Sequence, residues 1–321
     1  MASGELTAAV APFAEAPATA ASRPLERRSV TAAMADYVAL TKPRVIELLL
    51  VTTVPPMFLA AGGWPGAWLI AATLIGGTLT AGAANAMNMV RDRDIDARML
   101  RTRQRPLPAG RITPRSAMLF GAVLGIAGPT WLWITVGSLP AALTAAAMAF
   151  YVGVYSWWLK RTTVHNIVIG GAAGAVPVLV GWAAVSGTVG AGAWVLFMIV
   201  FLWTPPHFWA LAIVCDRDYA AASVPMLPVV HGRHETARRS LRYAVATVAC
   251  SLLLPLADAR IGVVYIAAAI VLGAILGHRA VNLARRSSPP VARRLFRYSI
   301  QYLALLFTAV IVDQLLPWPG S

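Results

Sequence analysis

One short stretch of the chain combines the residue types and spacing of a metal and phosphate site. Asn88, Asp92 and Asp96 recur at every fourth position. Four residues of an α-helix turn through about 400°, so these side chains drift only about 40° apart per step and share one helix face. Their oxygens suit Mg²⁺, and the guanidinium forks of Arg101 and Arg105 suit phosphate oxygens. The spacing therefore predicts a site for a metal-bound diphosphate.

The same residues could instead be ordinary surface charge in a solvated loop. The chain has only 13 acidic residues, however, and three of them, Asp92, Asp94 and Asp96, follow one long apolar run directly. Such a concentration favours a binding site. A second acidic pair, Asp216 and Asp218, follows another apolar run in the same way.

The composition indicates which elements position these residues. Of the 321 residues, 58% are hydrophobic and 12% are charged. Residues 65–90, 116–159 and 162–215 contain no Lys, Arg, Asp or Glu. A spanning helix needs about 20 apolar residues, so each of the two longer runs can hold two helices. Runs of this length are unlike the alternating strands of a membrane barrel. We therefore expect an all-α polytopic membrane protein.

Turn and charge signals divide the apolar stretches into about nine transmembrane helices. They are expected at about 45–62, 68–90, 114–136, 141–159, 166–186, 192–214, 240–257, 261–278 and 297–316. If the amino terminus is cytoplasmic, every Lys and Arg except Arg260 lies on the cytoplasmic side, as the positive-inside rule requires. The sequence thus predicts a multi-pass plasma-membrane protein whose acidic segments both face the cytoplasm.

Other features exclude function classes and define the ends of the domain. The net charge of +14 would suit nucleic acid, but the basic residues lie in the predicted loops, so we expect no nucleic-acid partner. Cys215 and Cys250 form neither a CxxC pair nor a zinc pattern. Residues 1–30 are rich in Ala, Pro, Ser and Thr, which predicts a disordered cytoplasmic tail before a membrane domain at 31–321.

Five ordered blocks of sequence resemble a known family. The segment from Asn88 to Asp96, followed by Arg101 and Arg105, is similar to the first motif of the UbiA-type intramembrane prenyltransferases. Within that family, the blocks resemble the branch that farnesylates protohaem. The further blocks lie at 40–44, 166–175, 203–211 and 218–230, and the resemblance runs from about 36 to 310.

The resemblance implies a reaction and an architecture. The farnesyl group of farnesyl diphosphate would be transferred to a vinyl group of protohaem IX (haem B), with addition of water, giving haem O and diphosphate. Nine helices would surround a central cavity. The expected partners are farnesyl diphosphate, protohaem IX and membrane lipid. Further expected partners, in a bacterial host, are a downstream haem A synthase or the oxidase assembly machinery. Haem B would be a substrate, and Mg²⁺ the cofactor.

The motifs predict roles for individual residues in such a reaction. Asp92, Asp96 and Asp218 are expected to be catalytic. The expected metal ligands are Asn88, Asp92, Asp96, Asp216 and Asp218, and the expected diphosphate clamp is Lys42, Arg101 and Arg105. Many relatives have a second motif of two aspartates four positions apart, whereas Asp216 and Asp218 are followed at that spacing by alanines. Which of the two carboxylates contacts the metal therefore stays open.

Two histidines are candidates for contact with haem. His207 follows Pro205 and Pro206 inside an apolar run, where a polar residue is costly and commonly functional. Its imidazole could bind haem iron or orient the porphyrin, or it could bond to carbonyls that the prolines leave free. His165, at a helix edge beside Lys160, could contact a haem propionate or simply lie at the interface.

Two alternative functions fit the same pattern. One is a related prenyltransferase that acts on an aromatic quinone precursor, and the other is a non-catalytic haem-handling or transport protein of the membrane. Transporters place charged residues near mid-membrane, whereas the acidic segments here lie at a predicted membrane edge. The Trp-Thr-Pro-Pro-His block at 203–207 favours the haem branch over the quinone branch.

Overall fold

The computed structural model describes residues 29–316, and the side chain of one residue within that range, Leu48, is not described. The described part is all helical. Its elements are α1 (Val30–Thr41), α2 (Pro43–Ala61), α3 (Ala67–Arg91), α4 (Arg93–Arg98), α5 (Pro114–Thr135), α6 (Ser138–Ala149), η1 (Phe150–Leu159), α7 (Lys160–Thr162), α8 (Asn166–Ser186), α9 (Ala191–Val214), α10 (Asp216–Ala221), α11 (Leu227–Ala257), α12 (Val263–Arg286) and α13 (Pro289–Leu315). The predicted disordered tail lies outside the described residues except for its last two positions.

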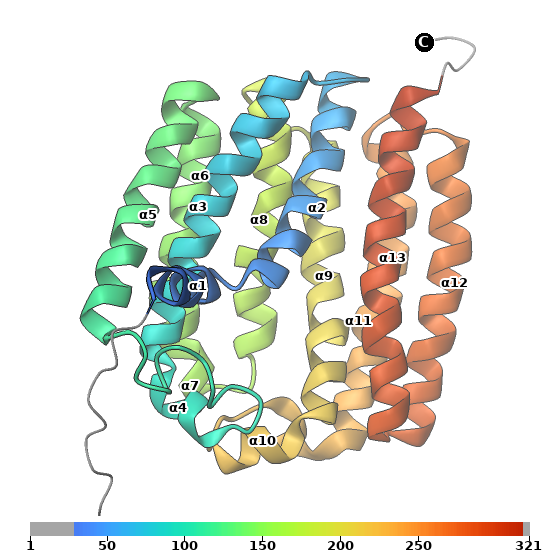
Figure 1. The fold of residues 1–321 in the computed structure, drawn as a ribbon. Helices are drawn as coiled ribbons and strands as arrows, with labels where there is room; N and C mark the ends of the chain where they lie inside the picture. Colours follow the sequence, from blue (N-terminus) through green and yellow to red (C-terminus); the bar gives the residue numbers. More distant parts are fainter. Residues whose placement is uncertain (1–28, 317–321) are drawn as a thin grey trace, which may run out of the picture.

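Nine helices of the described part are long and apolar enough to cross a membrane, which confirms the prediction of an all-α multi-pass protein. They are α2, α3, α5, the continuous run α6–η1–α7, α8, α9, α11, α12 and α13. Figure 1 shows these helices standing side by side, with α4, α7 and α10 gathered at one end of the bundle. We call this the loop end, because it carries both acidic segments.

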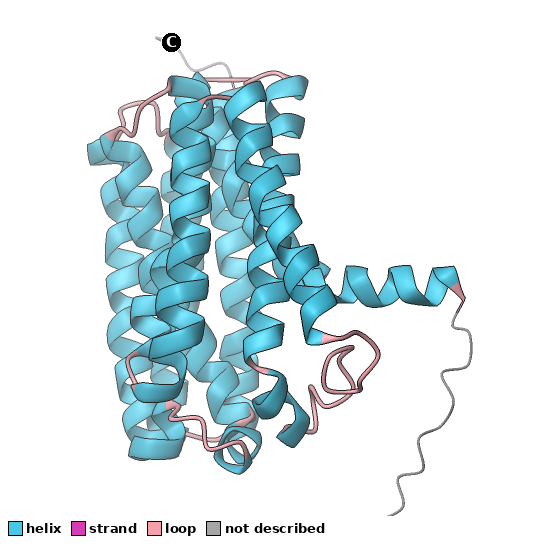
Figure 2. Cartoon of the chain, turned by 90° about the vertical axis from the view of Figure 1, so that its left-hand side faces the viewer, coloured by secondary structure: helices cyan, strands magenta, loops and turns pink. Residues whose placement is uncertain are grey.

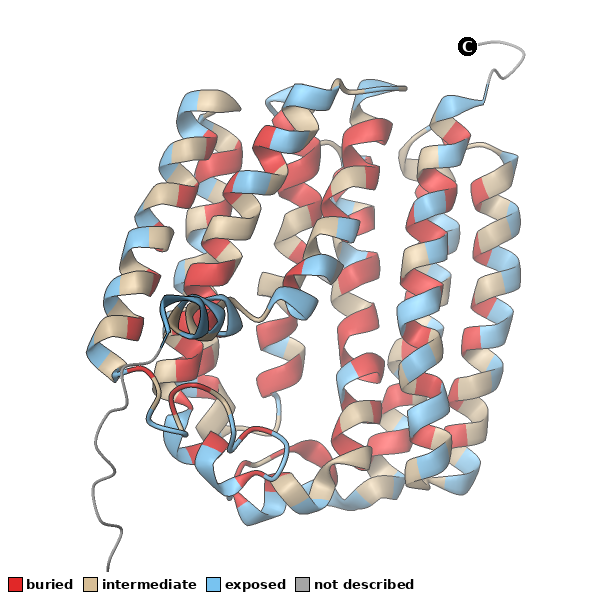
Figure 3. Ribbon diagram, viewed as in Figure 1, coloured by how far each residue is buried: buried red, intermediate tan, exposed pale blue. Residues whose placement is uncertain are grey.

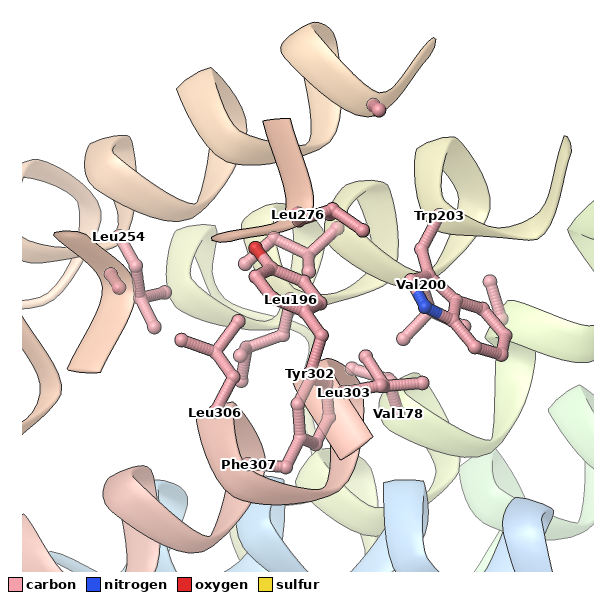
Figure 4. Packing of buried hydrophobic residues seen from close by; sticks show 14 of the residues in the cluster. Val178, Leu196, Val200, Trp203, Leu254, Leu276, Tyr302, Leu303, Leu306 and Phe307 are labelled. Atoms are coloured by element: carbon pink, nitrogen blue, oxygen red, sulfur yellow. The ribbon is translucent and has the colours of Figure 1, made fainter. Parts of the chain in front are cut away.

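Two kinds of packing hold the bundle together. On one side, α9, α11, α12 and α13 enclose a cluster of large buried side chains, part of which Figure 4 shows. On the other side, α3 and α5 approach closely through glycines. A Cβ atom added to Gly128 would lie 2.2 Å from Oγ1 of Thr80 and 2.9 Å from the carbonyl oxygen of Gly76. Small residues allow such close approach in membranes, where burial of apolar surface gives little preference for one partner. Figure 3 shows buried positions on both sides.

The first helix differs in direction from all the spans. α1 projects sideways from the bundle, as Figure 2 shows, and the structure thus adds a helix that the sequence did not predict. On the side of α1 that faces the bundle, the ring of Tyr37 packs edge-on against that of Phe120, with 5.1 Å between the ring centroids. Val30, Met34 and Val38, four positions apart, are 76%, 63% and 56% exposed. α1 therefore presents an apolar stripe away from the bundle.

Several helices extend further than their apolar residues suggest. α11 begins at Leu227 rather than near 240, α12 continues to Arg286, and α13 begins at Pro289. The extra turns carry arginines. Their long side chains can place the charged groups at the membrane surface while the backbone stays helical. Within α11 the chain bends at Gly232, whose φ of 78° and ψ of 167° are not helical.

Candidate active site

A cavity of about 380 Å³ lies between the helices, and all its charged lining residues except Lys42 come from the segments at the loop end. The long wall is formed mainly by α2, α3, α8 and α9. The charged residues of the lining are Lys42, Asp92, Asp96, Arg101, Arg105 and Lys160. Four cations and two carboxylates give this end a formal charge of +2. Such a site attracts an anion, and an apolar chain attached to that anion can lie in the rest of the cavity.

The first acidic segment is built as the spacing predicted, although α3 ends within it. Asp92 caps α3 with a φ of −91° and a ψ of 3°, and α4 starts at the next residue. The helical hydrogen-bond pattern nevertheless continues, from the amide of Asp92 to the carbonyl of Asn88 at 2.9 Å and from the amide of Asp96 to the carbonyl of Asp92 at 2.7 Å. All three side chains line the cavity. Asp94 points elsewhere, with a side chain that is 54% exposed.

Cations hold the two cavity carboxylates. Nζ of Lys160 donates to Oδ2 of Asp92, and the Arg105 guanidinium donates to Oδ2 of Asp96 at 2.8 Å. The carboxylates are only 1% and 3% exposed, so they need these partners to stay charged in a buried place. A diphosphate entering the cavity would meet the same cations. The cations of these ion pairs are therefore within reach of an anionic group at this end of the cavity.

Lys42 reaches the site from the turn between α1 and α2. It adopts a left-handed conformation, with φ 54° and ψ 65°, directly before Pro43. Its Nζ donates to Oδ1 of Asn88 at 2.8 Å. Burial, followed by the neighbouring charges of Arg105 and Lys160, lowers the pKa of Lys42 to about 7. An anionic ligand would offset these effects and favour the charged ammonium form.

A π-helical segment places Lys160. Residues Phe150–Leu159 form η1, a type of helix that is rare at this length and is common at functional sites. Inside it, Oγ of Ser156 donates to the carbonyl of Tyr151 at 2.9 Å and accepts from Nδ2 of Asn88 at 3.0 Å. This contact fixes the Asn88 amide with its oxygen towards Lys42. The segment thus aligns the end of the fourth span with the acidic end of α3.

The second acidic segment contributes to the cavity in a way that the sequence did not predict. Oδ2 of Asp216 accepts from Nε of Arg233 at 2.6 Å, and neither Asp216 nor Asp218 lines the cavity. The neighbouring Tyr219 does line it. Burial raises the pKa of Tyr219, while Arg101 acts in the opposite direction. The segment therefore places a neutral phenol, rather than a carboxylate, at the cavity wall.

The residues around Asp92 fit a Mg²⁺ ion. Oδ1 of Asp92 is buried and has no hydrogen-bond partner, which is costly for a carboxylate oxygen unless a ligand completes the site. No cluster of three His, Cys, Asp or Glu residues suited to a metal occurs among the described residues. Mg²⁺ does not require one, because one or two carboxylates together with substrate phosphates and water are its usual ligands. Asp92 and Asp96 meet that requirement.

Both candidate haem-binding histidines lie outside the cavity lining. His207 is 5% exposed, and its Nδ1 lies 2.8 Å from Oγ of Ser299 on α13. Its ring stacks on Trp203 and Phe296, at 4.3 and 4.6 Å between centroids. The adjacent Phe208 lines the cavity instead. His165 is exposed and precedes α8.

Sequence reasoning missed several groups of the site. Lys160 and Tyr219 line the cavity, and so do Tyr151 and Tyr155 of η1. Lys160 follows the aromatic pair Trp157-Trp158 closely, a pattern that is typical of a membrane interface rather than of a binding site. The available signal was its position at the end of a span that must return to the same loop end as Asp92.

Comparison with known proteins identifies the family. The model of the UbiA prenyltransferase family matches residues 49–305. The chain belongs to the UbiA prenyltransferase family. A relative from Clavibacter michiganensis subsp. michiganensis, named protoheme IX farnesyltransferase, is 54% identical over 285 residues, which cover 88% of this chain and 93% of the relative. The similarity thus extends over most of both chains.

Solved structures of UbiA proteins share the fold. The digeranylgeranylglyceryl phosphate synthase structure matches with a TM-score of 0.72 and 16% identity, covering 88% of this chain and 99% of that one. A UbiA homologue from Archaeoglobus fulgidus bound to GPP and Mg²⁺ matches with a TM-score of 0.60 and 16% identity, over 86% of this chain and 99% of that one. At these identities the likeness concerns the fold, and the helical bundle described above is that of the family.

Proposed function

We propose that this protein transfers the farnesyl group of farnesyl diphosphate to a vinyl group of protohaem IX, with addition of water, and releases haem O and diphosphate. One observation carries the proposal: a positively charged end with a buried, unpartnered carboxylate oxygen opens into a cavity that is otherwise largely apolar. The name of the Clavibacter relative supports protohaem and farnesyl groups as the substrates.

The diphosphate end would work through the cations and carboxylates described above. Lys42, Arg101 and Arg105, together with Lys160, would bind the diphosphate oxygens and neutralise the charge that develops as the leaving group departs. Asp92 and Asp96, with Asn88, would hold Mg²⁺, which when bound polarises the diphosphate oxygens. The Mg²⁺ in the Archaeoglobus structure supports the choice of metal.

Asp216 and Asp218 would join the metal site only after a rearrangement. Asp216 would have to leave Arg233, and the short helix α10 would have to turn its acidic face towards the cavity. Diphosphate binding supplies a reason, since Arg101 lines the same cavity as Tyr219 of α10, so an anion that binds Arg101 would lie beside this segment. We retain both carboxylates as proposed ligands of the substrate-bound state, with Asp218 in a catalytic role.

The transfer itself needs an environment without water near the farnesyl carbon. Cleavage of the C–O bond leaves an allylic cation, the vinyl π electrons attack it to form the new C–C bond, and water captures the resulting cation next to the porphyrin ring with loss of a proton. Tyr155, Trp203 and Phe208 line the cavity and provide aromatic walls for a flat substrate. Contact of haem with His207 or His165 stays a prediction.

The orientation of the site follows from charge. Among the described Lys and Arg residues, only Arg260 lies at the end opposite the acidic segments. We therefore propose that the loop end faces the cytoplasm of a bacterial cell and that farnesyl diphosphate enters from that side. A haem A synthase or the oxidase assembly machinery would receive the product.

A reconstitution experiment tests the proposed function. The purified protein is incubated with protohaem, farnesyl diphosphate and Mg²⁺, and the porphyrin is analysed by mass spectrometry. A product heavier than protohaem by one farnesyl group and one hydroxyl group is expected. Farnesylation of an aromatic quinone precursor in place of haem would assign the protein to a different branch. Haem binding without any product would support a non-catalytic role.

A further inference from the structure

A second pocket, separate from the central cavity, lies between α12 and α13. It has a volume of about 180 Å³ and is lined by Arg279, Asn282, Arg286, Val291 and Arg294. None of these residues lines the central cavity. Figure 1 shows that the connection between the two helices is at the loop end of the bundle, at the bottom in that view. We propose that this pocket binds the phosphate headgroup of an anionic phospholipid.

The spacing of the lining residues makes the pocket a built feature of two helices. Arg279, Asn282 and Arg286 are three and four positions apart, so they share one face of α12. Val291 and Arg294 are three positions apart on α13 and face that surface. The helices are joined beside it, because the hydroxyl of Tyr298 donates to the carbonyl of Leu272 at 2.9 Å. Rigid backbone elements therefore hold the three guanidinium groups around one space.

The charge in this pocket calls for an anion. No acidic residue lines it, and none of its three arginines forms an ion pair with any residue that the structure describes. Three cations around one space repel each other unless an anion joins them. Guanidinium groups bind phosphate oxygens through paired hydrogen bonds, and basic pockets between helices at a membrane surface commonly bind lipid headgroups. Asn282 adds a side-chain amide, whose Nδ2 forms a hydrogen bond of 2.8 Å with Nε2 of His278.

Neighbouring apolar residues favour a lipid over a free phosphate ion. Val271 and Ile275 lie about two turns and one turn before Arg279, respectively, on the same face of α12. They are 58% and 38% exposed, and both belong to a helix apolar enough to cross a membrane. An acyl chain can run along this face while its phosphate occupies the pocket. A soluble phosphate would gain nothing from these residues.

The test uses native mass spectrometry of the full-length protein in detergent, titrated with phosphatidylglycerol, phosphatidylcholine or inorganic phosphate. The variant R279Q/R294Q removes two pocket arginines. The control R285Q/R297Q removes the same charge from the same two helices, at positions that do not line the pocket. If each pocket arginine contributes as a basic residue does beside an anionic membrane, the first variant should bind phosphatidylglycerol about thirtyfold more weakly. The control should bind it like the wild type.

Each outcome decides the proposal. Equal losses in the two variants would mean that net charge, rather than the pocket, attracts the lipid, and would overturn it. So would equal binding of phosphatidylcholine, or tight binding of inorganic phosphate alone. The variant R279K/R294K keeps the charge without the fork and should lose part of the affinity. The melting temperature of each variant shows whether it is folded, so that a loss of binding is read only from folded protein.

Discussion

Three carboxylates stand close together in the first acidic segment, and their surroundings give them different roles. Asp92 and Asp96 are buried in the cavity wall, whereas Asp94 faces outwards and pairs with Arg161 at 2.6 Å. Hydrogen bonding to the Arg161 guanidinium holds the pKa of Asp94 well below its usual range. Asp94 therefore stays charged at neutral pH and ties α4 to the end of the fourth span.

Replacing each aspartate by asparagine should separate these roles. D92N and D96N each remove a charge that would hold Mg²⁺, so kcat/KM for farnesyl diphosphate should fall about a hundredfold or more. D94N should retain most activity, because its partner lies outside the cavity. The measurement is steady-state transfer at saturating Mg²⁺. Equal losses at all three positions would show that Asp94 has a direct role of its own.

Removal of the metal gives an independent check at the same residues. Chelation with EDTA should abolish transfer, and added Mg²⁺ should restore it, because the lysines and arginines of the site would not supply the polarisation that Mg²⁺ held by Asp92 would supply. Transfer is measured before and after readdition, with Ca²⁺ as a comparison of equal charge. Full turnover in metal-free enzyme would remove Mg²⁺ from the proposal.

Prediction from sequence succeeded at these residues where the contacts are local. Asn88, Asp92 and Asp96 lie on one face because helical hydrogen bonds continue past the end of α3. The sequence did not predict contacts between segments that are distant along the chain. The ion pair of Asp216 with Arg233 depends on where α11 begins. The contact of Lys160 with Asp92 depends on a π-helix, which the hydrophobic periodicity of the sequence does not predict.

At the scale of elements, the close contact between α3 and α5 constrains the position of a helix that lines the cavity. These helices meet through Gly76 and Gly128, and α3 is also the helix that carries Asn88 to the cavity. A larger residue at the contact would push the helices apart. Any such shift would be transmitted to the site, because packed helices move as rigid units.

A single methyl group should therefore be destabilising at this contact. G128A places a Cβ atom 2.2 Å from Oγ1 of Thr80, and a cost of about 1–3 kcal/mol is expected for overpacking. The control is G277A in α12, where nothing lies within 4 Å of the added atom. Thermal unfolding in detergent compares the two variants. A melting temperature of G128A equal to that of G277A would contradict the predicted packing.

The existence of the spans was predictable, and so, to within about three residues, were the ends of the first six, whereas the loop-side ends of the last three were not. Long apolar runs set the number of helices because the bilayer requires about 20 apolar residues for each crossing. The ends of α11, α12 and α13 lie in arginine-containing sequence, where composition resembles a loop. The additional helix α1 was missed for a related reason, since its 12 residues are too few to cross the membrane and it lies beside the bundle instead.

For the whole molecule, the distribution of charge sets the orientation in the membrane. The loop end carries the described Lys and Arg residues apart from Arg260. Arg260 is itself neutralised, because its guanidinium contacts Asp258 at 2.7 Å. The opposite end is therefore nearly free of net positive charge, as expected for a surface that was moved across the membrane during insertion.

Cysteine labelling in intact cells tests this orientation. In a background without Cys215 and Cys250, T188C should react with a membrane-impermeant maleimide added outside, because Thr188 lies in the connection between α8 and α9. R103C, in the connection between α4 and α5, should react only after the cells are opened. The reverse pattern would place the acidic segments outside the cell and overturn the assigned topology.

The sideways direction of α1 has a consequence for the depth at which the reaction takes place. A helix with an exposed apolar stripe settles at the boundary between headgroups and acyl chains. Lys42 follows α1 directly and contacts Asn88 at the charged end of the cavity. If α1 lies at that boundary, it would hold Lys42, a proposed diphosphate-binding residue, near the level of the lipid phosphates. A prenyl diphosphate can then pass from the bilayer to the site without its headgroup leaving the layer in which it already lies.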